Sequence, residues 1–242
     1  MKVFPVVHLG ETSMDSSIYQ AHVAHELGAD GIYLIDHYNA SRDTGPLFDT
    51  LEGIREANPD RYVGLNILGL DVPSAFGRVA TALASGRLHE TPSDIWVDDV
   101  RSGTMTGFNL EGAFDFRKSL KEVADVTLHG GIAFKYTQTA TNVAKIARDE
   151  ASALGKYVDV ITTSGMGTGQ PPTVEKLEAM KSVAGEKPIA VASGIDLGNI
   201  ESFAETVDEV LVASSVETEP GSGVFNRKEL AEFIRIAHSL AR

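Results

Sequence analysis

The chain has 242 residues, 43% of them hydrophobic, no cysteine and a formal net charge of −13. The absence of cysteine excludes thiol catalysis and cysteine-ligated zinc, and it is typical of a reducing cytoplasm. The acidic balance argues against a nucleic-acid partner, and no apolar run approaches the roughly 18 residues of a membrane helix. Because the N-terminus lacks a small-residue cleavage pattern, we interpret it as a first strand and expect a cytoplasmic protein.

Eight short apolar runs, each followed by a segment of helical periodicity, divide the chain. The predicted strands are residues 3–9, 31–36, 62–68, 94–98, 132–136, 157–163, 188–193 and 209–214. The predicted helices are residues 16–27, 47–57, 74–85, 111–123, 140–154, 174–183, 197–206 and 227–240. Nearly continuous apolar strands between amphipathic helices indicate a parallel sheet that is covered on both faces.

Eight strand–helix units in a chain of this length predict one α/β domain, a (β/α)₈ TIM barrel over residues 1–242. The rival architecture is an open, doubly wound sheet. It would normally show a glycine-rich fingerprint after the first strand, and "VVHLGETS" supplies none. The closed barrel is therefore the predicted fold.

Polar residues stand at the end of every predicted strand. They are His8, Asp36, His37, Asn66, Asp98, Asp99, Lys135, Thr163, Ser164, Ser193, Ser214 and Ser215. The opposite strand ends carry turn sequences such as Gly-Ala-Asp and Asn-Pro-Asp. Since the active sites of these barrels lie at the carboxyl ends of the strands, this asymmetry predicts the ligand-binding face.

Four of these residues are candidates for catalysis. Lys135 follows the apolar "GGIAF" and could bind an anion, stabilise an enolate or form a Schiff base; alternatively it pairs with an aspartate as a structural lysine. Asp36 and Asp98 could act as a general base and its partner, and His8 as an acid or base. Asn66 suits a sugar hydroxyl. We identify no metal-binding motif, although Mg²⁺ at Asp36 or Asp98 is compatible with the sequence.

Two loops rich in small residues predict a phosphate site. "VASGIDLGNI" and "VASSVETEPGSGVFN" follow the seventh and eighth strands, where TIM barrels usually bind phosphate. Small residues allow the backbone amides to approach an anion closely. We therefore expect Ser193, Gly194, Ser214 and Ser215 to bind a phosphorylated small molecule. Tight structural turns are the alternative interpretation.

The stretch "ITTSGMGTGQPPT" places three glycines, Gly165, Gly167 and Gly169, directly before two prolines. The spacing matches neither a dinucleotide fingerprint nor a Walker loop. The prolines, or Thr173 after them, are expected to set the start of the sixth helix. Together with Thr163 and Ser164, the glycines are predicted to form a loop that closes over a ligand.

This stretch and the segment "PIAVASGIDLGNIESFAETVDEVLVASSVE" resemble the C-terminal half of the BtpA/SgcQ family of TIM-barrel proteins. The matching residues are Gly165, Thr168, Gly169, Pro171 and Pro172, then Ser193, Gly194 and Asn199, and finally Ser214 and Ser215. The family's acidic-aromatic element after the second strand is "IDHYN" here, and its Lys-His is Lys135-Tyr136. The family resembles ribulose-phosphate-binding barrels in its last two strands, so the resemblance implies a TIM barrel with a phosphorylated ligand.

Three functional hypotheses follow. The first is an enzyme that transfers protons on a small phosphorylated sugar or ribose-phosphate compound, as isomerases and lyases do. The second is a nucleosidase or phosphoribosyl-transfer enzyme, with Tyr33, Tyr38 or Phe108 stacking on a base. The third, implied by the family's name, is a non-catalytic assembly factor for photosystem I. A homo-oligomer is compatible with all three.

Overall fold

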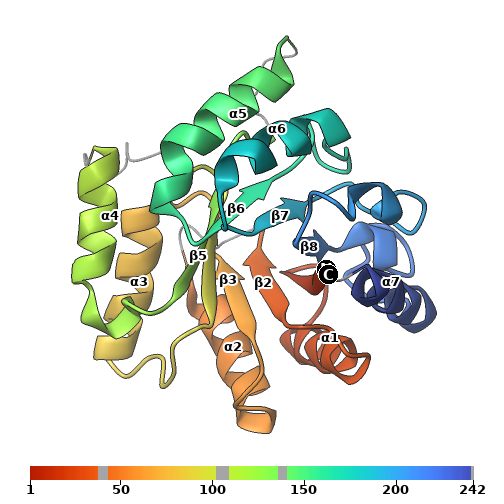
Figure 1. The fold of residues 1–242 in the computed structure, drawn as a ribbon. Helices are drawn as coiled ribbons and strands as arrows, with labels where there is room; N and C mark the ends of the chain where they lie inside the picture. Colours follow the sequence, from red (N-terminus) through yellow and green to blue (C-terminus); the bar gives the residue numbers. More distant parts are fainter. Residues whose placement is uncertain (38–42, 102–108, 136–140, 241–242) are drawn as a thin grey trace.

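Eight parallel strands close into a barrel in chain order, with β8 paired to β1 (Figure 1). The computed structural model describes residues 1–37, 43–101, 109–135 and 141–240. The strands are β1 (Lys2–Leu9), β2 (Ile32–Asp36), β3 (Val63–Asn66), β4 (Asp94–Val97), β5 (Thr127–Gly131), β6 (Val160–Thr163), β7 (Ile189–Ala192) and β8 (Glu209–Val212). The predicted TIM barrel is confirmed.

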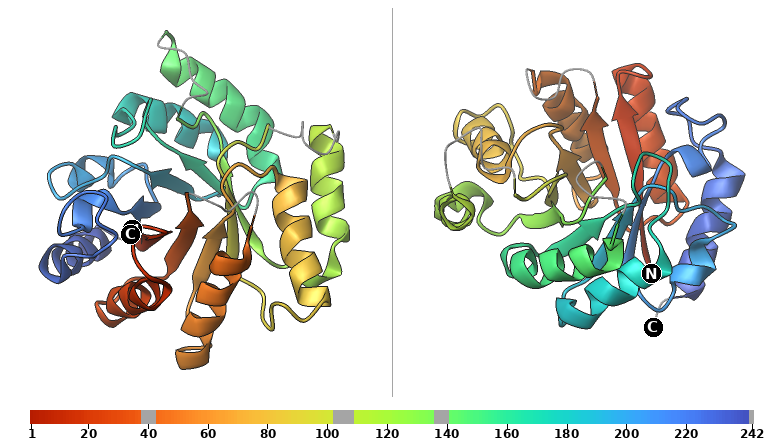
Figure 2. Two further views of the ribbon diagram at one scale, coloured as in Figure 1. Left: turned by 180° about the vertical axis from the view of Figure 1, so that it is seen from behind. Right: turned by 90° about the horizontal axis from the view of Figure 1, so that it is seen from above.

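Helices cover the outside of the barrel in all three views (Figures 1 and 2). The α-helices of the described residues are α1 (Met14–Glu26), α2 (Gly45–Ala57), α3 (Val72–Ala84), α4 (Leu110–Ser119), α5 (Val143–Leu154), α6 (Val174–Ala184) and α7 (Arg227–Ser239). Short 3₁₀ helices are η1 (Lys121–Val123), η2 (Gly155–Tyr157), η3 (Ile200–Phe203) and η4 (Ser214–Val216). Among these elements, no helix combines the length and the apolar character needed to cross a bilayer.

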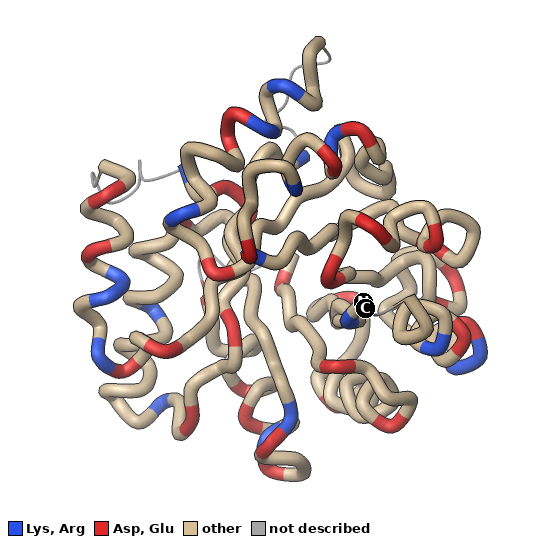
Figure 3. The backbone as a smooth tube through the Cα atoms, in the orientation of Figure 1, with Lys and Arg blue, Asp and Glu red and all other residues tan. Residues whose placement is uncertain are grey.

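The starts of several helices follow from local sequence. The side chain of Thr173 accepts a hydrogen bond from the Lys176 N–H, so α6 begins directly after the two prolines, as predicted. Ser13, Asp71 and Asn109 cap α1, α3 and α4 in the same way. Charged residues of both signs are interspersed along the backbone, so the net charge of −13 is not confined to one segment (Figure 3).

Alternation along each strand decides which side chains enter the barrel. In β2, Tyr33 and Ile35 join an interior cluster in which Tyr33 packs edge-on against Phe4 and Trp96, with ring centroids 5.8 and 5.9 Å apart. Ile32 and Leu34 instead pack in the layer between strands and helices. The same alternation decides which polar residues at the strand ends point into the barrel and which point towards the helices.

The fifth strand begins five residues earlier than predicted, and it contains the paired glycines of "TLHGG". Gly130 and Gly131 are the last residues of β5. A Cβ on Gly131 would collide with the Asp98 carbonyl, and the Gly131 carbonyl accepts a hydrogen bond from the Val100 N–H at 3.2 Å. Glycine is therefore used here for a close backbone approach by the chain that leaves β4. Lys135 consequently lies in the loop after β5 and not in the strand.

The predicted helix over residues 197–206 was also wrong. The Asp196 carboxylate accepts a hydrogen bond from the Gly198 N–H, and the Asn199 side chain accepts one from the Asp196 N–H. These short-range bonds hold a turn where the helix was expected to begin. Only the 3₁₀ helix η3 follows, before the chain enters β8.

A buried charge network lies at the N-terminal end of the barrel interior. His129 Nδ1 is 2.6 Å from Asp94 Oδ2, and its Nε2 is 2.8 Å from Glu209 Oε2. Lys2 adds an ion pair to Glu209 at 3.0 Å, and the Tyr62 hydroxyl donates to Asp94. Burial by itself lowers the pKa of His129, but the charges and hydrogen bonds of the two carboxylates raise it to about 9. We refer to these five residues as the floor network.

Candidate functional site

A cavity of about 460 Å³ opens at the carboxyl ends of the strands. We call it the mouth cavity. Its walls include side chains of β1, β2 and β4 and the loops that follow β5 to β8. Eight predicted site residues line it: His8, Asp98, Lys135, Gly169, Ser193, Gly194, Ser214 and Ser215. The structure thus brings residues from across the whole sequence to one ligand-sized space.

The other predicted site residues lie outside the cavity wall. Asp36 is on the outward phase of β2 and lines a separate cavity of about 210 Å³ beside α1 and α2. Asp36 and Asp98 thus line different cavities, so the structure does not bring the predicted base and its partner together in one. Its neighbour His37 lines the mouth cavity instead. Thr163, Ser164, Gly165 and Gly167 do not line the mouth cavity, and Asn66 lies behind Asp98.

Asp98 is held by Asn66. The Asn66 side chain is 1% exposed and donates from Nδ2 to Asp98 Oδ1 at 2.9 Å. Burial raises the pKa of Asp98, and the hydrogen bond from Asn66 and the charge of Lys135 only partly oppose this rise. A half-buried carboxylate with a raised pKa, oriented by an amide and facing a cavity, has the properties of a general acid or base.

Lys135 is positioned through its backbone. Its N–H donates to Ser164 Oγ at 2.8 Å, so Ser164 supports the loop that carries Lys135. Two residues upstream, Ala133 adopts a left-handed φ of 47°, and its carbonyl accepts a hydrogen bond at 2.7 Å from the buried ammonium of Lys176. Lys176 also donates to the Ser164 carbonyl at 2.6 Å. This lysine therefore ties the loops after β5 and β6 together.

Lys176 was missed at the level of sequence. In "TVEKLEAM" it reads as an ordinary helix-surface lysine, yet it is 1% exposed. Burial lowers its pKa to about 7, with the charge of Glu150 acting in the opposite direction. The only local signal is a basic residue in the first turn of a helix, where the helix dipole disfavours it.

The predicted phosphate loops meet the glycine loop at the cavity wall. The Gly169 N–H donates to Ser193 Oγ at 2.7 Å, and Ser215 Oγ donates to the Ile195 carbonyl at 2.7 Å. Ser193 has a φ of 110°, a strained conformation for a residue other than glycine. A Cβ on Gly194 would collide with the backbone of Pro171, so glycine is required where these loops touch.

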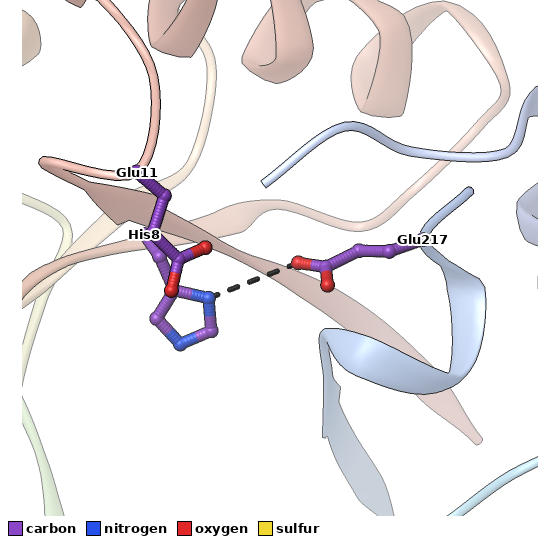
Figure 4. A group of neighbouring side chains, drawn as sticks. All are labelled: His8, Glu11 and Glu217. Atoms are coloured by element: carbon purple, nitrogen blue, oxygen red, sulfur yellow. Dashed lines mark ion pairs between the residues drawn. The ribbon is translucent and has the colours of Figure 1, made fainter. Parts of the chain in front are cut away.

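A second cluster of ionisable residues lies at the mouth cavity, and the sequence did not predict that these residues would meet. His8, Glu11 and Glu217 place one ligand atom each within 4.8 Å of one another, and their polar atoms converge (Figure 4). Burial raises the pKa of Glu11; the charge of His8 lowers it and that of Glu217 raises it. The His37 ring centroid is 4.8 Å from that of His8, and burial, His8 and Lys135 lower the pKa of His37. Glu11 and Glu217 lie two and five residues beyond the ends of β1 and β8, so they were not among the strand-end residues considered as candidates.

None of the three aromatic residues proposed to stack on a base is seen to line the mouth cavity. Tyr33 has no exposed surface and packs inside the barrel, so it cannot stack on a ligand in the mouth cavity. Tyr38 and Phe108 lie outside the described residues. Trp96 lines the cavity and was not predicted.

Comparison with known proteins gives one curated relative. The chain is 27% identical over 157 residues to the photosystem I biogenesis protein BtpA of Synechocystis sp.. The match covers 64% of this chain and 52% of the relative, so the chain spans about half the length of the curated relative that it matches. No protein-family profile matches the chain.

Solved structures of the same architecture cover nearly the whole chain. Phosphoribosyl anthranilate isomerase from Thermus thermophilus superposes with a TM-score of 0.62 at 17% identity, over 99% of this chain and 100% of that one. Orotidine 5′-monophosphate decarboxylase from Methanocaldococcus jannaschii gives 0.61 at 13% identity, over 97% and 98%. The tryptophan synthase alpha chain from Legionella pneumophila gives 0.62 at 12%, over 98% and 92%. The chain is thus a TIM barrel whose sequence is similar to that of BtpA, which confirms the predicted resemblance.

Proposed function

We propose that this chain is an enzyme that binds a small phosphorylated sugar or ribose-phosphate compound in the mouth cavity and transfers a proton on it, as isomerases and lyases do. One observation carries the proposal. Asp98 and Lys135 line the same cavity as the small-residue loops of Ser193–Gly194 and Ser214–Ser215. A pair of proton-transfer groups thus faces a surface suited to an anion.

The phosphate end of the ligand is assigned to the loops after β7 and β8. Gly194 and Gly221 have φ values of 78° and 84°, and both line the cavity where a side chain would limit the approach of an anion. Two of the solved structures with this fold are named for phosphorylated ribose compounds, namely phosphoribosyl anthranilate and orotidine 5′-monophosphate. The position also agrees with the usual phosphate site of the fold.

The chemistry is assigned to Asp98 and Lys135. The Asp98 carboxylate would take a proton from a carbon next to a carbonyl group, and the Lys135 ammonium would stabilise the resulting enolate. Asp98 would then return the proton to the neighbouring carbon in an isomerase, or a leaving group would depart in a lyase. Asn66 would keep the carboxylate oriented through both steps.

The first experiment is a thermal-shift screen of the wild-type chain against sugar phosphates, with the matching unphosphorylated sugars as controls. A ligand at about 100 times its Kd should stabilise the fold by about 2.7 kcal/mol. Lys135→Ala should then lower turnover of the stabilising compound by 10²-fold or more, while the exposed Lys118→Ala on α4 should leave it unchanged. Equal stabilisation by the unphosphorylated sugars would refute the phosphate assignment.

A non-catalytic role in assembly is the second candidate, because the curated relative is named for photosystem I biogenesis. An assembly role does not explain why ionisable side chains converge on the mouth cavity. Stable association with a membrane complex that is unaffected by Lys135→Ala and Asp98→Asn, together with no stabilisation by any phosphorylated compound, would favour it.

A further inference from the structure

His8, Glu11 and Glu217 meet where the loops after β1 and β8 lie side by side. His8 Nδ1 is 3.9 Å from Glu217 Oε1, too far for a hydrogen bond. Both atoms are buried, and neither has a hydrogen-bond partner among the described residues. The Glu217 side chain has no exposed surface. Two polar atoms that face each other across a gap, each without a partner, are costly unless something binds between them.

We propose that His8, Glu11 and Glu217 bind a divalent transition-metal ion, with Zn²⁺ as the ion that best fits this ligand set. One imidazole nitrogen and two carboxylate oxygens are typical zinc ligands. Mg²⁺ prefers oxygen ligands alone, so the histidine argues against it. Three protein ligands leave a fourth position for water or substrate, as in catalytic zinc sites.

The distances permit this coordination with a small movement. Ligand atoms about 2.0–2.2 Å from a tetrahedral zinc ion lie roughly 3.3–3.6 Å from each other. His8 Nδ1 and Glu217 Oε1, at 3.9 Å, are already close to that separation, and all three ligand atoms lie within 4.8 Å. Glu11 is exposed in the turn after β1 and can move the remaining ångström.

The surroundings orient the proposed ligands. The Gly221 N–H donates to Glu217 Oε2 at 2.6 Å, which leaves Oε1 directed at His8 (Figure 4). Gly223, with a φ of 65°, lies so close to Glu11 that a Cβ there would be 3.3 Å from the Glu11 side chain. The loop after β8 therefore supplies one ligand, fixes it by a backbone bond and packs against a second.

The proposed metal site borders the mouth cavity. His8 and Glu11 line the mouth cavity, and His37 lies beside His8. The fourth position would thus face the space assigned to the phosphorylated ligand. The inference goes beyond the proposed function, because metal binding is measurable without any substrate and stands or falls separately from proton transfer by Asp98 and Lys135.

The test is a titration of the EDTA-treated, dialysed chain with ZnCl₂ by isothermal calorimetry, with metal content checked by mass spectrometry. Wild type should bind one Zn²⁺ per chain, and MgCl₂ should bind at least 100-fold more weakly. Glu217→Gln and Glu11→Gln should each weaken Zn²⁺ binding at least 10-fold. Glu219→Gln, an exposed residue of the same loop, should titrate as wild type.

The variants separate loss of ligand from loss of fold. Glu217 is buried, so circular dichroism must show that Glu217→Gln is folded; Glu11 is exposed, and its substitution cannot remove core packing. Wild type that takes up less than one equivalent of Zn²⁺ at 100 μM would overturn the proposal. Unchanged binding by Glu11→Gln and His8→Ala would overturn it equally, since the ion would then be held elsewhere.

Discussion

The two ends of the barrel interior use ionisable residues in opposite ways. In the floor network, His129 is bonded at both ring nitrogens, and its charge faces Asp94 and Glu209. At the mouth end, Asp98 has an amide partner, while His8 Nδ1 and Glu217 Oε1 have no hydrogen-bond partner among the described residues. Side chains of the same chemical types are hydrogen-bonded to one another at one end, whereas at the other His8 and Asp98 line a cavity.

This contrast shows why burial alone does not identify a site. Asp94, His129 and Glu209 of the floor network are more deeply buried than Asp98 and His8 at the mouth, and they shift the pKa of His129 strongly. No cavity among those described reaches them. A shifted pKa indicates a functional site only where the ionisable group also faces a cavity that a ligand can occupy. Substitutions at the two ends should therefore separate stability from ligand binding.

The largest effect is expected at the floor. His129→Leu leaves Asp94 and Glu209 buried without their shared partner, which should lower the free energy of unfolding by about 3–5 kcal/mol. Urea denaturation measures this change. His89→Leu, on an exposed pair with Glu52, is the control and should cost less than about 1 kcal/mol. An unchanged urea midpoint for His129→Leu would show that the network contributes nothing.

The second prediction concerns pH. The pKa of His129 in the folded state is about 9, above the ordinary histidine value of 6.5, so the folded state holds the proton more tightly. Its stabilisation is fully present below pH 6.5 and is lost as pH rises towards 9. The difference in unfolding free energy between wild type and His129→Gln should shrink by a few kcal/mol over this range, on the scale of about 1.4 kcal/mol per pKa unit. A difference that is constant from pH 6 to 9.5 would contradict a protonated His129.

At the mouth, Asp98→Asn should reduce turnover by 10²-fold or more, which corresponds to about 2.7 kcal/mol, because the amide cannot accept the proton. The same substitution should change the free energy of unfolding by less than about 1 kcal/mol, since it removes a charge whose burial is unfavourable. Asp115→Asn on the exposed face of α4 is the control. A large loss of stability with retained turnover would place Asp98 with the floor network instead.

A smaller loss of stability than at the floor is expected where Lys176 joins the loops after β5 and β6. Lys176→Met keeps the aliphatic stem but removes the ammonium donor from the Ser164 and Ala133 carbonyls, of which Ala133 retains the Thr163 hydroxyl at 3.1 Å. The substitution should destabilise the fold by about 1–3 kcal/mol. Because Lys135 follows Ala133 in the same loop, ligand affinity should also fall, whereas Lys118→Met should change neither. Unaltered affinity in a destabilised Lys176→Met would limit this lysine to a structural role.

Many residues that line the mouth cavity could be predicted from the sequence, because the carboxyl ends of the strands in a TIM barrel form the ligand-binding face. His8, Asp98, Ser193 and Ser214 were found by asking which residues end a strand, and all four line the mouth cavity. Asp36 was misplaced because it sits on the outward phase of β2, one residue from the inward His37. A one-residue error in strand phase moves a side chain to the other face, and local sequence does not resolve that phase at a strand end.

The amino-acid sequence by itself predicted the eight strands in order, seven of the α-helices, the closed barrel and the loops of small residues, because hydrophobic periodicity and turn residues act over short distances. Only the tertiary structure decided that Glu217 meets His8 and Glu11, that Lys176 is buried and that Asp94, His129 and Glu209 form one network. These contacts join residues up to about two hundred positions apart, as in the 207-residue separation of Lys2 and Glu209. They arise when the strands pair around the barrel, including β8 with β1, and no local pattern encodes these contacts.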